Sequence, residues 1–234
     1  MSVNVGSARP NPKGTGPDTG IHKVPVRSAY LQDPGPKRVE GGLGVSGVAG
    51  DVVGDGRHHG GSTQAVYAFA SEELAWWAGV LGRDLPPGSF GENLTTVGLD
   101  VDAAIIGERW RIGGEDGPIV RVTGPRIPCN VFRLTMQEQG WVKRFAERGR
   151  TGSYLAVERP GTVTEADAVD ILSQPDHGVT VPMLFRAITT DPRWAEQALR
   201  ARPYLEGELV AKLEKRSTYG LDAEPGAGTA APAF

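Results

Sequence analysis

The sequence predicts a mainly β protein that forms a closed β-barrel with a few short helices, followed by a small all-α unit. The first observation is composition: 33 of the 234 residues are glycine and 18 are proline, well above the roughly 12% that is usual for these two residues together. Such residues disfavour long helices, because each one costs a helix interior about 1–3 kcal/mol. The second is that short apolar strings alternate with Gly/Pro turns, which favours a barrel over a layered βαβ sheet. The third observation is that apolar residues recur at helical spacing after about Leu172.

The expected strands are short and separated by turn residues. Two are predicted at 2–5 and 21–26, on either side of a loop rich in Gly, Pro and Asn. Three more are predicted at 105–112, 119–123 and 153–158. Several of these positions alternate apolar and polar side chains, which is the pattern of a half-buried strand.

Two helices are expected within this β-rich part. The first begins at Ser71, whose hydroxyl can cap it, and ends at Gly82, and its apolar residues recur at helical spacing. The second is short and is predicted at 141–148. Between them, the two prolines in 124–129 predict a rigid loop, because proline restricts its own backbone and that of its predecessor.

Three regions follow from these patterns. Residues 1–172 are expected to form the barrel and residues 173–217 a three-helix unit. Within that unit, Asp191 precedes a proline, which is the arrangement of an N-cap followed by proline at the first helical position. Residues 218–234 are rich in Ala, Gly and Pro, and this tail is expected to be disordered.

Charge and cysteine content exclude several classes of protein. The net charge is −3, with 25 basic and 28 acidic residues, so a basic nucleic-acid-binding domain is not expected. No apolar run approaches the roughly 20 residues of a membrane span, and the N-terminus lacks the pattern of a signal peptide. Cys129 is the single cysteine, which excludes an intrachain disulfide and a Cys-pair zinc site. A cytoplasmic location is the expectation.

Two adjacent histidines precede a pair of glycines at 58–61. His58 and His59 cannot point to the same face of a strand, so at most one of them is expected to point into a given site. Gly60 and its neighbour would let a ligand approach the backbone closely. The alternative is a glycine turn with one surface histidine and one that is hydrogen-bonded within the fold.

Cys129 is the candidate reactive residue. It follows a proline in the rigid loop, and Arg126 lies three positions earlier. A neighbouring positive charge lowers the pKa of a thiol and favours the thiolate, which is a nucleophile and a soft-metal ligand. The alternative is a small buried residue with no chemical role. Asn93, in a tight loop, is either a polar site residue or simply a turn residue.

Taken together, four motifs resemble MOSC domains, which are named from the C-terminal part of molybdenum-cofactor sulfurase. The resemblance rests on their order and rough spacing: Gly20-Ile21-His22-Lys23-Val24-Pro25-Val26, His58-His59-Gly60-Gly61, Gly91-Glu92-Asn93-Leu94 and Pro125-Arg126-Ile127-Pro128-Cys129. The likeness is to the bacterial type that carries a small three-helix unit, and it covers roughly residues 1–216. It implies a β-barrel, a molybdenum cofactor (molybdopterin) and molybdenum ligation by the Cys129 thiolate. It also implies reduction of N-hydroxylated bases and related N-oxygenated compounds.

The resemblance also assigns roles to residues around Cys129. Lys23 and Arg126 suit the cofactor phosphate, as a point charge and a planar fork respectively. His59 is the general acid by residue type. The remaining cofactor-binding candidates are His58, Gly60 and Asn93. The partners implied are a small N-hydroxylated substrate and an external electron-donor protein, with no nucleic acid and no membrane; a homodimer is left open.

One position departs from the family pattern. The family commonly has an acidic residue where this sequence has Thr63, which puts the substrate range or the turnover in question.

Two other functions are compatible with these residues. A non-enzymatic carrier of the cofactor, or of sulfur on Cys129, would use the same residues. A hydrolase would use Cys129, His59 and Asn93 as nucleophile, base and orienting group.

Overall fold

A computed structural model of the protein describes residues 1–221, and the remainder of the predicted disordered tail, 222–234, lies outside the described residues. Twelve strands lie within this part of the chain. They are β1 (Ser2–Gly6), β2 (Lys23–Val26), β3 (Ser28–Leu31), β4 (Val39–Glu40), β5 (Leu43–Gly44), β6 (Val66–Ala70), β7 (Leu94–Thr96), β8 (Arg109–Ile112), β9 (Ile119–Pro125), β10 (Ser153–Arg159), β11 (Gly161–Thr164) and β12 (Val169–Ser173).

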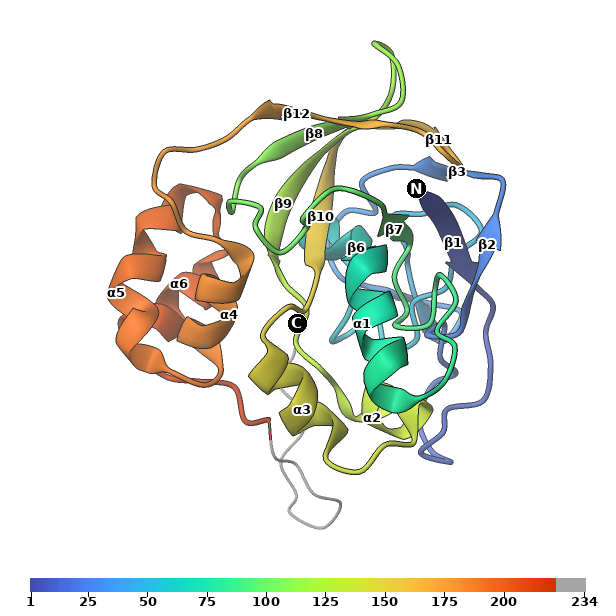
Figure 1. The fold of residues 1–234 in the computed structure, drawn as a ribbon, viewed down its shortest axis with the longest axis horizontal. Helices are drawn as coiled ribbons and strands as arrows, with labels where there is room; N and C mark the ends of the chain where they lie inside the picture. Colours follow the sequence, from blue (N-terminus) through green and yellow to red (C-terminus); the bar gives the residue numbers. More distant parts are fainter. Residues whose placement is uncertain (222–234) are drawn as a thin grey trace.

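The main sheet is mixed and contains eight of these strands. Their order is β12-β8-β9-β10-β6-β7-β1-β2. Most neighbours are antiparallel, whereas β6 and β7 are parallel. These two strands are joined through a helix that lies beside them in Figure 1. A parallel connection requires such a crossover, and this one introduces a strand–helix–strand unit into the sheet.

The predicted closed β-barrel is wrong. In the part of the chain that the structure describes, β2 pairs only with β1 and β12 pairs only with β8, so the two ends of the sheet do not meet. Strands that could have extended the sheet pair separately, β3 with β11 and β4 with β5. The glycine-rich stretch at 41–61 forms mostly loops.

Helices are more numerous than the sequence predicts, and the fold is α/β. Residues 1–221 contain six α-helices: α1 (Ser71–Leu81), α2 (Asn130–Met136), α3 (Trp141–Arg148), α4 (Val181–Ile188), α5 (Ala195–Ala198) and α6 (Gly207–Glu214). Three 3₁₀ segments accompany them: η1 (Ser62–Gln64), η2 (Pro192–Trp194) and η3 (Leu199–Tyr204). In Figure 1, α4, α5 and α6 group on one side, beside β8–β10, whereas β1 and β2 lie on the other.

Local signals specify several helix ends. Gly82 ends α1 in the left-handed conformation, as expected. The predicted cap at Ser71 is wrong, since Ala70 occupies the N-cap position and the Ser71 hydroxyl bonds to Glu72. Asp191 accepts a hydrogen bond from the Arg193 amide, as its position before proline predicts. Helix α2, which starts directly after the rigid loop, was not predicted.

Two hydrophobic clusters hold these layers together. The larger one lies between the sheet and the C-terminal helices, so that Trp110 and Val120 of the sheet share it with Leu184 and Leu213. The smaller one is aromatic and packs beneath α1, α2 and α3. Its central ring, Phe90, is fully buried and contacts five other aromatic rings: Phe69, Trp77, Phe132, Trp141 and Phe145.

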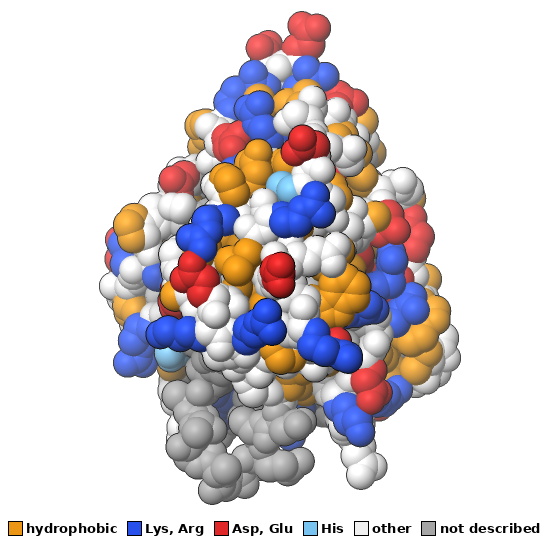
Figure 2. All heavy atoms as spheres, turned by 90° about the vertical axis from the view of Figure 1, so that its left-hand side faces the viewer, with side chains coloured by type: hydrophobic (Ala, Val, Ile, Leu, Met, Phe, Trp, Pro, Cys, Tyr) orange, Lys and Arg blue, Asp and Glu red, His pale blue; other side chains and the backbone are white. Residues whose placement is uncertain are grey.

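The outer surface on the side of the C-terminal helices is polar and mixed in charge. Figure 2 shows basic and acidic side chains interspersed with scattered apolar ones on this face. The apolar stripe of α4, including Leu184 and Phe185, is instead buried. Tyr219, at the start of the predicted tail, is also buried, and its amide donates to the carbonyl of Ile188. No helix of residues 1–221 has the length and apolar character needed to cross a bilayer.

Candidate functional site

A cavity of about 330 Å³ lies among the loops at one end of the main sheet. This volume falls within the range of small-molecule sites. Its wall is built from segments far apart in the sequence, including 18–23, 51–60, 90–93 and 126–131. All of the residues that the sequence suggested for the site line this one cavity: Lys23, His58, His59, Gly60, Asn93, Arg126 and Cys129.

Close backbone packing shapes this wall. A Cβ atom on Gly20 would lie 1.9 Å from the carbonyl oxygen of Val52, so these two loops touch backbone to backbone. Gly88, at a φ of +89°, likewise packs against the carbonyl of Lys23. Glycine is required at both places, because any side chain would push two cavity-lining loops apart.

Cys129 occupies the N-cap position of α2, where the chain leaves the rigid loop. Burial by itself would raise the pKa of its thiol. Opposing this, a hydrogen bond from His59, the positive charges of His59 and Arg126, and the backbone amide of Phe132 together lower the pKa of Cys129 to about 6. The half-buried sulfur is therefore largely a thiolate at neutral pH.

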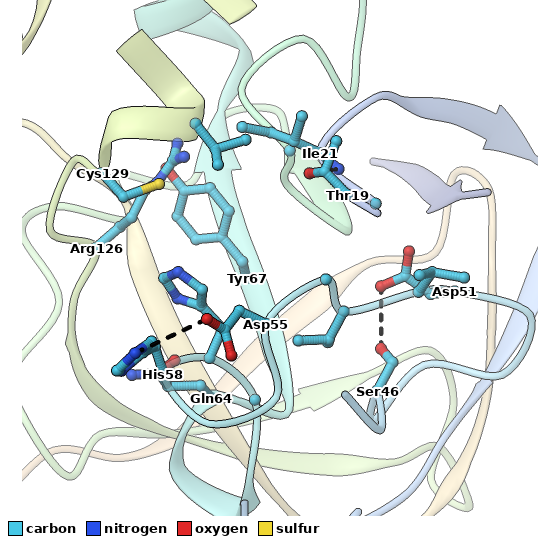
Figure 3. Close-up of a pocket in the computed structure, with 18 of the residues that line it drawn as sticks. Thr19, Ile21, Ser46, Asp51, Asp55, His58, Gln64, Tyr67, Arg126 and Cys129 are labelled. Carbon is cyan, nitrogen blue, oxygen red and sulfur yellow. Dashed lines mark hydrogen bonds and ion pairs between the residues drawn. The ribbon is translucent and has the colours of Figure 1, made fainter. Parts of the chain in front are cut away.

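Arg126 places a buried cation beside this sulfur. Its guanidinium donates to the carbonyl oxygen of Phe90 at 2.7 Å and lies 3.7 Å from the centre of the Phe132 ring. It is also hydrogen-bonded to Tyr67. No carboxylate within residues 1–221 forms an ion pair with it, although only 5% of the residue is exposed. Figure 3 shows Arg126, Cys129 and Tyr67 converging at one end of the cavity.

Lys23, at the other end, is already paired. Its ammonium group forms an ion pair with Asp51, and the exposed fractions of the two side chains are 7% and 2%. The second carboxylate oxygen of Asp51 accepts hydrogen bonds from Ser46, at 3.0 Å, and from the Asn93 amide, at 2.9 Å. Asp51 also accepts from the amide of Gly6. The carboxylate thereby connects several segments of the cavity wall (Figure 3).

Both polar atoms of the Asn93 side chain form hydrogen bonds to other segments of the chain. Its side-chain oxygen accepts a hydrogen bond from the amide of Tyr67, and its nitrogen donates to Asp51 and to the carbonyl of Asn4. The neighbouring carboxylate of Glu92 accepts from the amides of Gly88 and Phe90 and from a threonine hydroxyl. This loop is therefore held by its own side chains, and Asn93 reaches the cavity with its polar atoms engaged.

The histidine pair lies in a turn anchored by Asp55. The backbone carbonyl of Asp55 accepts from the amides of His58 and His59, and its carboxylate lies 3.8 Å from the His58 ring nitrogen Nε2. His59 bonds to Cys129, as described above. The Nδ1 atom of His58 is buried and has no hydrogen-bond partner among residues 1–221. The two imidazoles thus have different surroundings, as expected for adjacent residues.

Thr63, the position that departs from the family pattern, does not line this cavity. Its hydroxyl donates to the carboxylate of Glu206 at 2.7 Å, and its carbonyl accepts from Thr123. Thr63, Thr123 and Glu206 line a smaller cavity, of about 40 Å³, between the sheet and the C-terminal helices. Gln64 and Tyr154 line both cavities.

Sequence reasoning missed three residues of the site. Asp51 stands alone between glycine-rich stretches, and three of its four partners come from distant segments, so no spacing identifies it. Tyr67 and Tyr154 lie within strands, where their pattern matches ordinary core positions. Their rings are 5.4 Å apart, and the two residues pair directly across β6 and β10. The phenolic hydroxyl is the only signal that either residue offers.

Comparison with known proteins gives consistent matches. The MOSC domain profile matches residues 55–170. The protein YflK of Bacillus subtilis is 30% identical over 182 residues, which cover 77% of this chain and 76% of YflK. A protein of Gibberella moniliformis named "Reductase" is 27% identical over 138 residues, which cover 56% of this chain but only 23% of that protein.

The fold is shared with a solved structure. The crystal structure of YiiM from Geobacillus stearothermophilus superimposes with a TM-score of 0.69 at 21% identity, covering 92% of this chain and 96% of that one. At this identity the match shows a common fold. With the matched profile and the extent of the likeness to YflK, it leads to one conclusion: the chain belongs to the MOSC domain family.

Proposed function

We propose that this protein is a molybdenum-cofactor-dependent reductase of N-hydroxylated purines or related N-oxygenated small molecules. The observation that carries the proposal is the Cys129 thiol, which faces a cavity with its pKa lowered to about 6 beside His59 and Arg126. Soft metals prefer thiolate ligands. MOSC domains are associated with the molybdenum cofactor, and one relative carries the name "Reductase".

The residues present fit such a cofactor. Two buried atoms on the cavity wall, Nδ1 of His58 and Oε1 of Gln64, lack hydrogen-bond partners within the described chain. Such atoms are rare in folded proteins, and their presence favours a polar ligand. Among residues 1–221, no group of three or more His, Cys, Asp or Glu side chains could hold a metal ion. A metal at Cys129 would therefore bring most of its ligands with it, as a pterin dithiolene does.

The cavity offers separate groups to the metal and to the phosphate of such a cofactor. Cys129 would bind the metal. Arg126 lies at the same end of the cavity, and no carboxylate of residues 1–221 forms an ion pair with it, so it would attract the phosphate. Lys23 remains a candidate for the same role, but Asp51 balances its charge, so it would act as a hydrogen-bond donor more than as a free cation.

When bound, the cofactor would supply a two-electron reduction. The reaction R–NH–OH + 2 e⁻ + 2 H⁺ → R–NH₂ + H₂O then needs an external electron-donor protein, which we propose as the partner. His59, predicted as the general acid, is hydrogen-bonded to Cys129 and favours its thiolate form. A reducing compartment such as the cytoplasm would keep Cys129 unoxidised, and we place the protein there as part of the proposal.

The test is a stoichiometric assay. The chain would be produced in cells that make the cofactor, and the purified protein would be mixed with a reduced dye and an N-hydroxylated purine. We expect one amine formed for each two electrons taken from the dye. Bound molybdenum without any loss of the N–OH group would instead indicate a cofactor carrier. Absence of molybdenum from the purified protein would contradict the proposal.

A further inference from the structure

We infer that Tyr154 is a catalytic residue of this site, whose phenolic O–H gives a proton to the departing oxygen of the substrate. The inference rests on the proposed function and extends it, because it names a proton donor that the sequence did not indicate. Tyr154 lies on β10 and lines the cavity that also contains Cys129.

The first observation is that the hydroxyl of Tyr154 is uncommitted. Within residues 1–221 it forms no hydrogen bond, although the residue is only partly exposed. The hydroxyl of Tyr67, whose ring lies 5.4 Å away, donates instead to the carbonyl of Thr151 at 2.7 Å. The two neighbours therefore differ: the Tyr67 hydroxyl is used within the fold, whereas the Tyr154 hydroxyl is available to a ligand in the cavity.

The second observation is that the strand is irregular at this residue. Tyr154 pairs with Gly124 of β9, whereas the next residue, Leu155, pairs with Val122, which leaves Thr123 as an extra residue on β9. The hydroxyl of Thr123 lies between two carbonyl oxygens, 2.5 Å from that of Thr63 and 2.9 Å from that of Tyr154, and its single hydrogen is shared between them. β-Bulges are frequent beside active sites, where they redirect a side chain.

The third observation is that Tyr154 is held rigidly on both sides. It pairs with β9 through Gly124 and with β6 through Tyr67. Positioning on a central strand gives a catalytic group the precision that a loop does not. The backbone of Tyr154 is fixed by the sheet even though its hydroxyl has no partner.

The fourth observation concerns the competing donor. The imidazole of His59 is hydrogen-bonded to Cys129, so its proton is already engaged with the sulfur. Tyr154 interacts electrostatically with both Cys129 and Arg126. Tyr154 is therefore a hydroxyl donor on the same cavity wall, and its hydroxyl has no hydrogen-bond partner within the described chain.

When bound, the cofactor would supply the two electrons, which come from the external donor protein. In the proposed step the N–O bond of R–NH–OH breaks as the substrate takes up these electrons. Tyr154 transfers its proton to the departing oxygen, which already carries one hydrogen and leaves as water. The nitrogen takes the second proton from solvent, giving R–NH₂. Solvent then returns a proton to the phenolate of Tyr154. Protonating a poor leaving group in this way typically accelerates a reaction by about 10²–10⁴-fold.

The experiment compares cofactor-loaded wild type with Tyr154→Phe, which deletes an oxygen that makes no hydrogen bond in the fold. We expect the same melting temperature, molybdenum content and KM for an N-hydroxylated purine, with kcat reduced by about 100-fold or more. Tyr30→Phe is the matched control. It makes the same chemical change on β3 at a residue that is 44% exposed and lies outside the cavity, and its kcat should equal that of the wild type.

The other outcomes separate the two claims. If the wild type reduces the substrate and Tyr154→Phe turns over equally fast, the inference is overturned and the proposed function stands. The same holds if Tyr154→Phe raises KM with kcat unchanged, or loses molybdenum, because the hydroxyl would then bind substrate or cofactor. A molybdenum-loaded wild type that leaves the N–OH group intact overturns both claims.

Discussion

The ammonium group of Lys23 is ion-paired with the carboxylate of Asp51, 28 positions further along the chain. Both side chains are almost completely buried. Because Asp51 also holds Ser46 and Asn93, this pair joins the segments that form one end of the cavity. The lysine that the resemblance assigns to a phosphate is therefore part of a network that maintains the shape of the site.

Replacing Lys23 should test this network. Lys23→Met leaves a buried carboxylate without its ion-pair partner, and we expect a loss of about 3–5 kcal/mol in the free energy of unfolding. Lys23→Met/Asp51→Asn removes both charges and should recover part of this loss. Urea denaturation of the two variants and the wild type measures it. A Lys23→Met variant as stable as the wild type would show that the pair does not support the fold.

A methyl group on Gly20 should disturb the cavity wall. Its Cβ would lie 1.9 Å from the Val52 carbonyl oxygen, so Gly20→Ala should cost about 1–3 kcal/mol of stability. Gly79→Ala is the control. Gly79 lies inside α1 with no atom within 4 Å of the added Cβ, and alanine there should add about 0.5–1 kcal/mol. Thermal denaturation distinguishes the two; equal melting temperatures would contradict the close packing of these loops.

Cys129 should titrate near pH 6 in the cofactor-free protein. Against the effect of burial, the hydrogen bond from His59 and the charges of His59 and Arg126 lower the pKa of its thiol to about 6. Cys129 is the only cysteine, so thiolate absorbance at 240 nm, measured against Cys129→Ser, reports this residue alone. His59→Ala should shift the midpoint toward the ordinary thiol value. A wild-type midpoint at that ordinary value would refute the described surroundings of the sulfur.

Asp102 should make stability depend on pH in the acidic range. Burial raises the pKa of this carboxyl to about 6, opposed by the Gly152 amide and by Arg150. The folded state therefore binds the proton more tightly than the unfolded state. The resulting stabilisation is complete below about pH 4 and is lost as the pH rises through about 6.

Asp102→Asn isolates this effect, because an amide keeps an acceptor for Gly152 but cannot ionise. We expect the variant to be more stable than the wild type by about 2–3 kcal/mol at pH 8 and equally stable near pH 4. Urea denaturation at the two pH values measures both differences. A variant that is the less stable protein at pH 8 would show that the charged form of Asp102 contributes more through Arg150 than its burial costs.

The site was easier to predict from the sequence than the sheet. His59, Arg126 and Cys129 lie in short loops and Lys23 begins β2; their residue types suit a ligand site, and the structure brings them to one cavity. Helix α3 is found at the predicted residues, because its apolar spacing and flanking glycines are local signals. Local signals need no knowledge of how distant segments meet.

Barrel closure depends on distant segments, and there the prediction was wrong. Whether β2 reaches β12 is decided by the twist and length of all the strands between them, which no residue pattern records. The β6–α1–β7 crossover was not predicted, although its helix was. The reason is that β7 has only three residues, which is too short to show an alternating pattern. Asp51 was missed for a related reason, since its partners come together only in the folded chain.

The proposed reduction of N-hydroxylated compounds depends on the Cys129 thiolate. The most direct test is the rate of N–OH reduction of an N-hydroxylated purine, expressed per bound molybdenum, for wild type and Cys129→Ser produced with the cofactor. Serine preserves the size of the side chain but offers a hard, poorly ionised oxygen in place of a soft sulfur. We expect turnover in the wild type and almost none in Cys129→Ser. Equal rates at equal molybdenum content would contradict it.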